Sequence, residues 1–140
     1  MTVPQGTVDK AATPETEASP YVVRAETPVY GGYVIVRDGK VLFIKGAVPG
    51  ELVEVSIEEK KRDYSIAIVQ SVLEPSPSRR RPPCPVFGTC GGCQLQFTES
   101  GRQVSIKEEI LLETMKRIGS VDAVLNPSLT AHEFRYRHRG

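Results

Sequence analysis

Apolar and polar positions alternate along the first half of the chain as is typical of β-strands. Between Leu52 and Glu58 the alternation indicates a strand with one buried face. Asp38-Gly39 is a strong hairpin signal. The other four strands are expected at 22–26, 33–37, 40–44 and 64–73. Five short strands with glycine-rich turns and no helical pattern predict a mainly-β fold, a small closed or nearly closed barrel, since closure removes exposed sheet edges.

A helical period appears only towards the end of the chain, where the spacing of apolar residues predicts a helix over 102–118 with Gly119 as its stop. Prolines at 75, 77, 82, 83 and 85 predict a stiff, extended linker before it. The proline-bearing, apolar-poor start is expected to be disordered. The expected divisions are a tail at 1–20, the barrel at 21–75, a linker with the cysteines at 76–100, and the helix with the start of a further region at 101–140.

Composition is that of a soluble globular protein, with 39% apolar and 25% charged residues. No apolar run approaches the roughly 20 residues needed to cross a bilayer, and the start lacks a secretory pattern. These features predict a cytoplasmic monomer without membrane contact.

The net charge of +1 hides two basic clusters, either of which is suited to an anionic polymer. One lies between Lys60 and Arg81, and the other is the run Arg135-Tyr136-Arg137-His138-Arg139. Lysines and arginines that simply solvate the surface are the alternative interpretation of each single residue.

All three cysteines lie in one loop, Cys84, Cys90 and Cys93, with the spacing C-x5-C-x2-C. Such clustering indicates a shared ligand or a redox pair, because unrelated buried cysteines would be scattered. The neighbouring glycines let the backbone turn its N–H groups towards thiolate sulfurs. Zinc and an iron–sulfur cluster fit the spacing equally well, and both call for a fourth ligand.

The loop and its continuation, Cys84-Pro85-Val86-Phe87-Gly88-Thr89-Cys90-Gly91-Gly92-Cys93-Gln94-Leu95-Gln96, closely resemble the iron–sulfur signature of the RNA uracil-5-methyltransferases. That family makes 5-methyluridine in ribosomal and transfer RNA. The segment 38–51 resembles the TRAM domain that precedes this signature in many members, and residues 134–139 fall in the family's order. The resemblance covers about residues 24–140 and implies an OB-like barrel, followed by the iron–sulfur loop and a helix that opens a truncated α/β part.

The resemblance implies that Cys84, Cys90 and Cys93 hold a [4Fe–4S] cluster whose fourth cysteine lies beyond this sequence. It also implies that the S-adenosylmethionine domain, the nucleophilic cysteine and the general base lie beyond Gly140. No catalytic residue is therefore assigned here, and the chain alone is expected not to transfer methyl groups. The family's covalent attack on uracil C6 requires an unstacked uridine.

The expected partner is RNA, more readily ribosomal than transfer RNA, held through phosphates and stacked bases. Tyr33 and Tyr64 are possible stacking partners, although core packing is the commoner role for such residues. The linker arginines are the strongest phosphate candidates, because prolines are expected to hold them away from the barrel and from packing. The predicted RNA-binding residues are Arg37, Lys40, Lys45, Lys60, Lys61, Arg62, Arg79, Arg80 and Arg81.

Two other functions fit the same residues. The first is a stand-alone RNA-binding TRAM module with a zinc-binding cysteine loop. The second is a redox or metal sensor in which the barrel displays Cys90 and Cys93. The basic clusters count against the sensor, which has no need of RNA.

Overall fold

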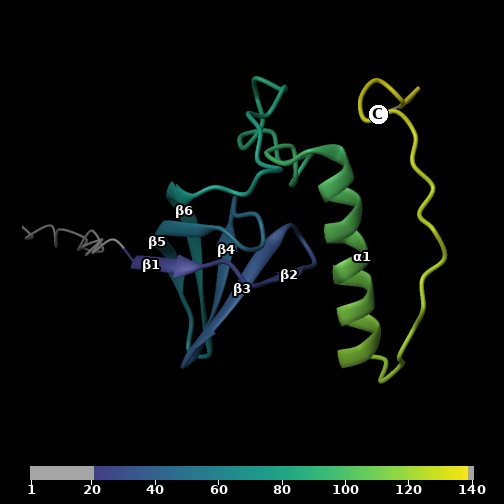
Figure 1. Ribbon diagram of the computed structural model, residues 1–140. Helices are drawn as coiled ribbons and strands as arrows, with labels where there is room; N and C mark the ends of the chain where they lie inside the picture. The colour runs from purple at the N-terminus through teal and green to yellow at the C-terminus, as the bar shows by residue number, and fades with distance from the viewer. Residues whose placement is uncertain (1–20, 139–140) are drawn as a thin grey trace, which may run out of the picture.

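A computed structural model describes residues 21–138 of the chain. It consists of a curled, mixed β-sheet, an irregular segment that projects above the sheet, one helix, and an extended segment that runs back along the helix (Figure 1). The predicted disordered tail, 1–20, lies outside the described residues, as do residues 139–140.

The sheet has six strands in the order β1-β5-β6-β4-β3-β2, and all neighbours are antiparallel except β4 and β6. The strands are β1 (Tyr21–Arg24), β2 (Thr27–Val29), β3 (Tyr33–Asp38), β4 (Lys40–Lys45), β5 (Leu52–Lys60) and β6 (Tyr64–Glu74). The predicted number of five strands is therefore wrong by one. The additional strand, β2, contains Pro28 and is short, and proline is tolerated because β2 forms an edge of the sheet.

The mainly-β, OB-like fold class is confirmed, but the sheet is a half-barrel and its closure is incomplete. The edge strands β1 and β2 do not pair with each other in the described part of the chain. A side-chain contact helps to draw the curl together, since Tyr21 Oη on β1 donates a hydrogen bond of 2.9 Å to Asp38 Oδ2 at the β3–β4 hairpin. This bond raises the pKa of Tyr21.

The concave face of the sheet carries the hydrophobic core. Alternate residues of each strand point inwards, so Val34, Ile44, Val53, Val55 and Ala67 are almost completely buried together. The two-residue period predicted from Leu52 to Glu58 thus gives the correct buried face. Removal of this apolar surface from water is the main force that folds the sheet.

The helix, α1 (Ser100–Arg117), begins two residues before its predicted start and ends one residue before its predicted end. Gly119 lies where the sequence places the stop, for a steric reason. A Cβ at Gly119 would be 2.8 Å from the Met115 carbonyl oxygen. The left-handed residue of this cap is Ser120, with φ of 52°.

The helix packs against β2, and among its residues only Ile106 is fully buried. The segment 120–138 then follows α1 back towards the irregular segment (Figure 1). No helix in the described range 21–138 is long and apolar enough to cross a membrane.

Candidate RNA-binding surface and cysteine loop

The three cysteines lie on a loop whose two ends are pinned together. Residues 78–80 run beside 97–99, with Arg80 N–H donating to the Phe97 carbonyl at 2.8 Å and Glu99 N–H donating to the Ser78 carbonyl at 2.9 Å. The buried Thr98 hydroxyl adds a bond of 3.1 Å to the Ser78 carbonyl. We call this pairing the neck. It lets residues 81–95 leave the sheet and return without disturbing it.

Inside the loop, glycine and glutamine determine the path of the backbone. Gly88 and Gly91 have positive φ, 87° and 72°, which other residues rarely adopt. The Gln96 side chain, almost buried, accepts a hydrogen bond of 3.2 Å from the Cys84 N–H. The trailing Gln-Leu-Gln of the signature therefore has a structural role, because its second glutamine anchors the first cysteine.

The donor set of the loop is chemically suited to a soft metal or an iron–sulfur cluster, since it offers three thiols within ten residues. Cys84 is half-buried, and Cys90 and Cys93 are exposed, all three as free thiols. Their positions are not yet those of a closed site. Within residues 21–138 no three Cys, His, Asp or Glu side chains come together as a metal-holding group.

The linker arginine nearest the sheet is part of a buried ion pair. Arg79 Nε and Nη2 donate to the two carboxylate oxygens of Glu51 at 2.6 and 2.8 Å, and Nη2 also donates to the Gly46 carbonyl at 2.6 Å. The guanidinium also lies 5.0 Å from the Phe97 ring centroid. The expectation that prolines hold this charge away from packing is wrong for Arg79.

The Glu51 carboxylate is completely buried and fully hydrogen-bonded. Besides Arg79 it accepts the backbone N–H groups of Val48 and Ser76 at 2.9 and 3.0 Å. Burial alone would raise the pKa of Glu51, but the bonds from Arg79 and from the two N–H groups outweigh it and lower the pKa. Glu51 thus joins the β4–β5 turn to the linker.

Arg80 is also engaged, with the segment that follows the helix. It forms an ion pair with Glu133 and donates from Nε to the Gln96 carbonyl at 3.1 Å. Gln103 on α1 donates to the same Glu133 carboxylate at 3.2 Å. Hydrogen bonding from Arg80 lowers the pKa of Glu133 and correspondingly raises that of Arg80. Arg80 therefore links the base of the cysteine loop to the C-terminal segment.

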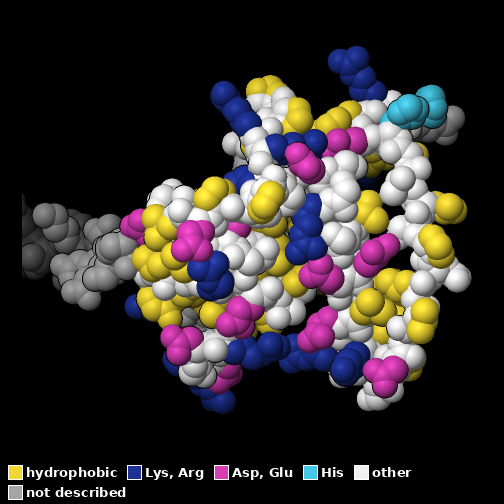
Figure 2. Space-filling model, viewed as in Figure 1, with side chains coloured by type: hydrophobic (Ala, Val, Ile, Leu, Met, Phe, Trp, Pro, Cys, Tyr) yellow, Lys and Arg dark blue, Asp and Glu magenta, His cyan; other side chains and the backbone are white. Residues whose placement is uncertain are grey.

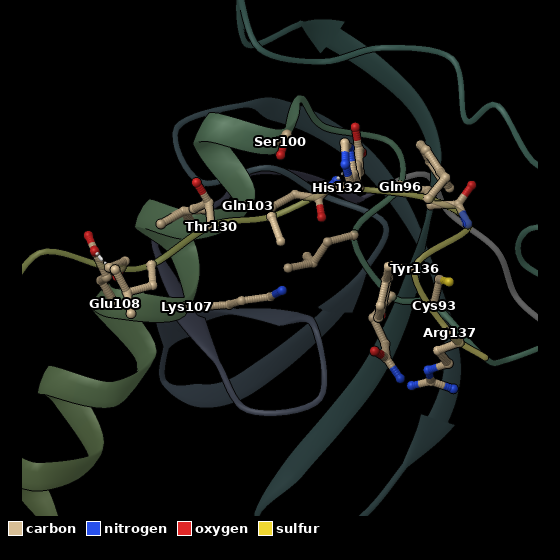
Figure 3. Close-up of a pocket in the computed structure, with 18 of the residues that line it drawn as sticks. Cys93, Gln96, Ser100, Gln103, Lys107, Glu108, Thr130, His132, Tyr136 and Arg137 are labelled. Carbon is tan, nitrogen blue, oxygen red and sulfur yellow. Dashed lines mark hydrogen bonds between the residues drawn. The ribbon is translucent and has the colours of Figure 1, made fainter. Parts of the chain in front are cut away.

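The Arg80–Glu133 ion pair lies at one side of a pocket of about 920 Å³ between α1, the cysteine loop and residues 125–137. Figure 3 shows Cys93 near Tyr136 and Arg137, with Lys107 extending from α1 into the same space. Arg135, Tyr136 and Arg137 of the second basic run thus line the same pocket as Cys93, more than 40 positions after it, a proximity that the sequence alone did not predict.

The other predicted RNA-binding residues differ in how far their charges are neutralised. Lys45, Lys61 and Arg62 form exposed ion pairs with Glu58, Glu59 and Asp63. The remaining four have no ion pair among the described residues, and they are Arg37, Lys40, Lys60 and Arg81. Figure 2 shows lysine and arginine side chains interleaved with acidic ones across the viewed face. Local pairing, more than the number of basic residues, decides which cations stay free.

Sequence reasoning missed the two carboxylates that organise the site, Glu51 and Glu133. A partial signal existed for Glu51, because a glutamate directly after a Pro-Gly turn and before a buried strand lies where an apolar residue would be more usual. Glu133 gave no such signal, since a glutamate outside any predicted helix or strand is unremarkable.

No family model matches the chain. Curated relatives do. An "Uncharacterized RNA methyltransferase" of Aquifex aeolicus is 43% identical over 86% of this chain. Two proteins named "23S rRNA (uracil(1939)-C(5))-methyltransferase RlmD", from Bordetella pertussis and Shewanella amazonensis, are 45% and 40% identical over 74% and 78% of it.

The chain belongs to the RNA uracil-5-methyltransferase family. The resemblance inferred from the cysteine signature is thereby confirmed. The chain spans 29%, 22% and 25% of the lengths of these three relatives. The similarity accordingly concerns the part of the family that contains the half-barrel, the cysteine loop and the helix.

Proposed function

We propose that this chain is the N-terminal RNA-binding and [4Fe–4S]-binding part of an S-adenosylmethionine-dependent RNA uracil-C5-methyltransferase that makes 5-methyluridine in 23S rRNA. The observation that carries the proposal is the identity of 40–45% over about three quarters of the chain to relatives named for that reaction. The cofactor domain and the nucleophilic cysteine belong, on this proposal, to portions of the relatives that the chain does not span. The protein acts in the cytoplasm as a monomer.

The three regions have separate tasks in this proposal. Residues 21–75, the TRAM domain, bind RNA, residues 76–100 hold the cluster, and residues 101–140 lead into the catalytic region. The neck supports this division, because it holds the two ends of the cysteine loop together where the loop leaves the sheet.

Cys84, Cys90 and Cys93 are proposed as three thiolate ligands of the [4Fe–4S] cluster, with the fourth supplied from outside these residues. The neck and Gln96 hold the ends of the loop, and Gly88 and Gly91 give the backbone the freedom to draw the two exposed cysteines together. When bound, the cluster organises the loop. No redox step is assigned to it.

Free cations are the best candidates for phosphate contacts. Arg37, Lys40, Lys60 and Arg81 have no ion pair among residues 21–138, so they can approach RNA without first breaking one. Lys45, Lys61 and Arg62 need only exchange exposed carboxylates that water already screens. Arg79 and Arg80 act mainly by shaping the surface.

Nucleoside analysis of RNA from cells that lack the gene for this chain tests the proposed reaction. We expect 5-methyluridine to disappear from one position of 23S rRNA and to remain in tRNA. Loss from tRNA alone would assign the chain to the tRNA branch. Unchanged 5-methyluridine in both RNAs would refute the proposed reaction.

Anaerobic purification with iron, sulfide and zinc analysis tests the cluster. We expect iron and sulfide with broad visible absorption in the wild type, retained in Thr89→Ser and lost in Cys90→Ser. The neighbouring Thr89 is a matched control because it lies in the same exposed loop without a thiol. Stoichiometric zinc without sulfide would refute the proposed cluster and support the alternative of a zinc-binding cysteine loop.

A further inference from the structure

A second groove, of about 620 Å³, lies between the cysteine loop and the part of the sheet formed by the start of β3, the end of β4 and the middle of β6. Its sheet wall contains Tyr33, Ile68 and Val69, and its loop wall contains Phe87, Gly91 and Cys93. The volume lies in the range of about 300–1,000 Å³ that is typical of pockets for drug-sized ligands. The groove is thus large enough for a nucleotide.

We propose that this groove holds one unpaired base of a single-stranded RNA, stacked on Tyr33. The inference rests on the proposed function and deepens it, because it assigns a particular place where the RNA is unstacked.

The chemistry of the lining favours an uncharged aromatic ring. No Asp or Glu lines the groove. Its two cations, Lys45 and Arg79, are each paired with a carboxylate, Glu58 and Glu51. The remaining lining is mostly aromatic, aliphatic or glycine, and a base can contact it through its flat faces.

Tyr33 is held ready for stacking by a row of rings. Phe43 packs edge-to-face against it with ring centroids 5.9 Å apart, and Tyr64 packs against Phe43 in the same way at 5.5 Å. All three rings lie on the face of the sheet opposite the core. Tyr33 pairs with Lys45, which is on the same face of β4 as Phe43, and Phe43 pairs with Ile66, which is on the same face of β6 as Tyr64. A braced ring loses little freedom when a base stacks on it.

Free cations lie at both ends of this row, where phosphates of the same strand would pass. Arg37 lies at the Tyr64 end on the same face of the sheet, since Arg37 pairs with Val41 and Val41 with Tyr64. Arg81 directly precedes the groove residue Pro82. An apolar groove between cations that lack ion pairs in residues 21–138 is complementary to a base between phosphates.

The width of the groove is fixed by a close approach of sheet and loop. Gly32, in the turn before β3, lies so near the loop that a Cβ there would be 2.5 Å from Gln94 Cβ. Gly32 and Gln94 both line the groove. The loop is therefore held close to the sheet where Gln94 approaches Gly32, the residue before Tyr33.

A coupling measurement tests the proposal. The affinity of the full chain for a fluorescently labelled single-stranded RNA from the target 23S region would be measured by fluorescence anisotropy. The measurement would be repeated with an abasic nucleotide placed at each position of the RNA in turn. In the wild type we expect one position where the abasic substitution weakens binding roughly 10-fold, as loss of one stacked base does. In Tyr33→Leu that position should lose its sensitivity.

Tyr30→Leu is the matched control. Tyr30 is 89% exposed and does not line the groove, so its variant should retain the abasic effect. Tyr33→Phe should also retain it, because the ring remains. The fluorescence of 2-aminopurine at the sensitive position should be quenched when the RNA binds to wild type, and quenched less when it binds to Phe87→Leu. This second measurement does not depend on whether Tyr33→Leu folds correctly.

RNA binding with no sensitive position, or with the same abasic effect in Tyr33→Leu as in wild type, would overturn the groove while leaving the proposed function intact. Absence of RNA binding at low salt would overturn both. These results are distinguishable because the first two require measurable binding.

Discussion

The half-barrel and the segment after helix α1 are stabilised in different ways. In residues 21–74 alternate apolar side chains point into one core, and Ile44, Val48 and Val53 have no exposed surface. In residues 118–138, Val124 and Leu129 are almost fully exposed, and the segment is held by polar contacts such as Arg80–Glu133 and Ser128–Glu108. The first region can fold by its own burial, whereas the second depends on a few specific bonds and on whatever binds there.

The half-barrel is joined to the linker that follows it at the buried Glu51–Arg79 pair, so breaking that pair should have the largest effect. Glu51→Ala removes the counter-ion of the Arg79 guanidinium, which keeps only the Gly46 carbonyl, and leaves two backbone N–H groups without their acceptor. We expect a loss of about 3–5 kcal/mol in the free energy of unfolding, measured by chemical denaturation. Glu74→Ala, which breaks the exposed Arg24–Glu74 pair, should cost less than about 1 kcal/mol. Equal losses in the two variants would contradict the anchoring role.

Acid should weaken the same contact in a predictable direction. Because the pKa of Glu51 is lower in the folded chain than in the unfolded one, its contribution is complete above the unfolded pKa and is lost as pH falls through the folded pKa. The pKa of Glu133 is also lowered in the folded chain, so its contribution to stability is likewise lost as the pH falls. Denaturation midpoints measured from neutral to acidic pH should fall less steeply in Glu51→Gln than in wild type. A steeper fall in the variant would show the sign to be wrong.

The contact between sheet and loop can be loosened without touching a charge. Gly32→Ala places a Cβ against Gln94 at a residue with φ of 79°, whereas Gly39→Ala meets nothing within 4 Å at a similar φ of 72°. Both should lose about 1–2 kcal/mol to backbone strain, and Gly32→Ala roughly 1 kcal/mol more from the clash. Thermal melting of the two variants measures the difference, which should vanish if sheet and loop are not in contact.

Neighbouring arginines provide the finest comparison. Arg81 is exposed and unpaired within residues 21–138, whereas Arg79 is part of the anchor. Arg81→Gln should leave stability within about 0.5 kcal/mol and lower the salt dependence of RNA binding by about one phosphate contact. Arg79→Gln should do the reverse and chiefly destabilise the fold. RNA titrations over a range of salt concentrations, with denaturation of both variants, would decide this, and interchangeable effects would refute it.

Local pattern predicted most of the strands and the helix because each depends on residues near in sequence. Asp38-Gly39 forms the expected tight turn between β3 and β4, with Gly39 at positive φ. No strand was expected at β2, which contains Pro28 and is tolerated because it lies at an edge of the sheet. Strand ends also shifted, since pairing with β6 extends β5 to Lys60, two residues beyond the alternation that predicted it.

The sequence by itself determined which family this chain belongs to, which face of each strand is buried, and that its three thiols share one loop. Spacing, period and signature are properties of neighbouring residues. Only the tertiary structure decided which charges are free. Glu51 and Arg79 are 28 positions apart, and Arg80 and Glu133 are 53 apart. Whether Arg79 and Arg80 find a carboxylate depends on how sheet, loop and C-terminal segment pack, and no local pattern records that.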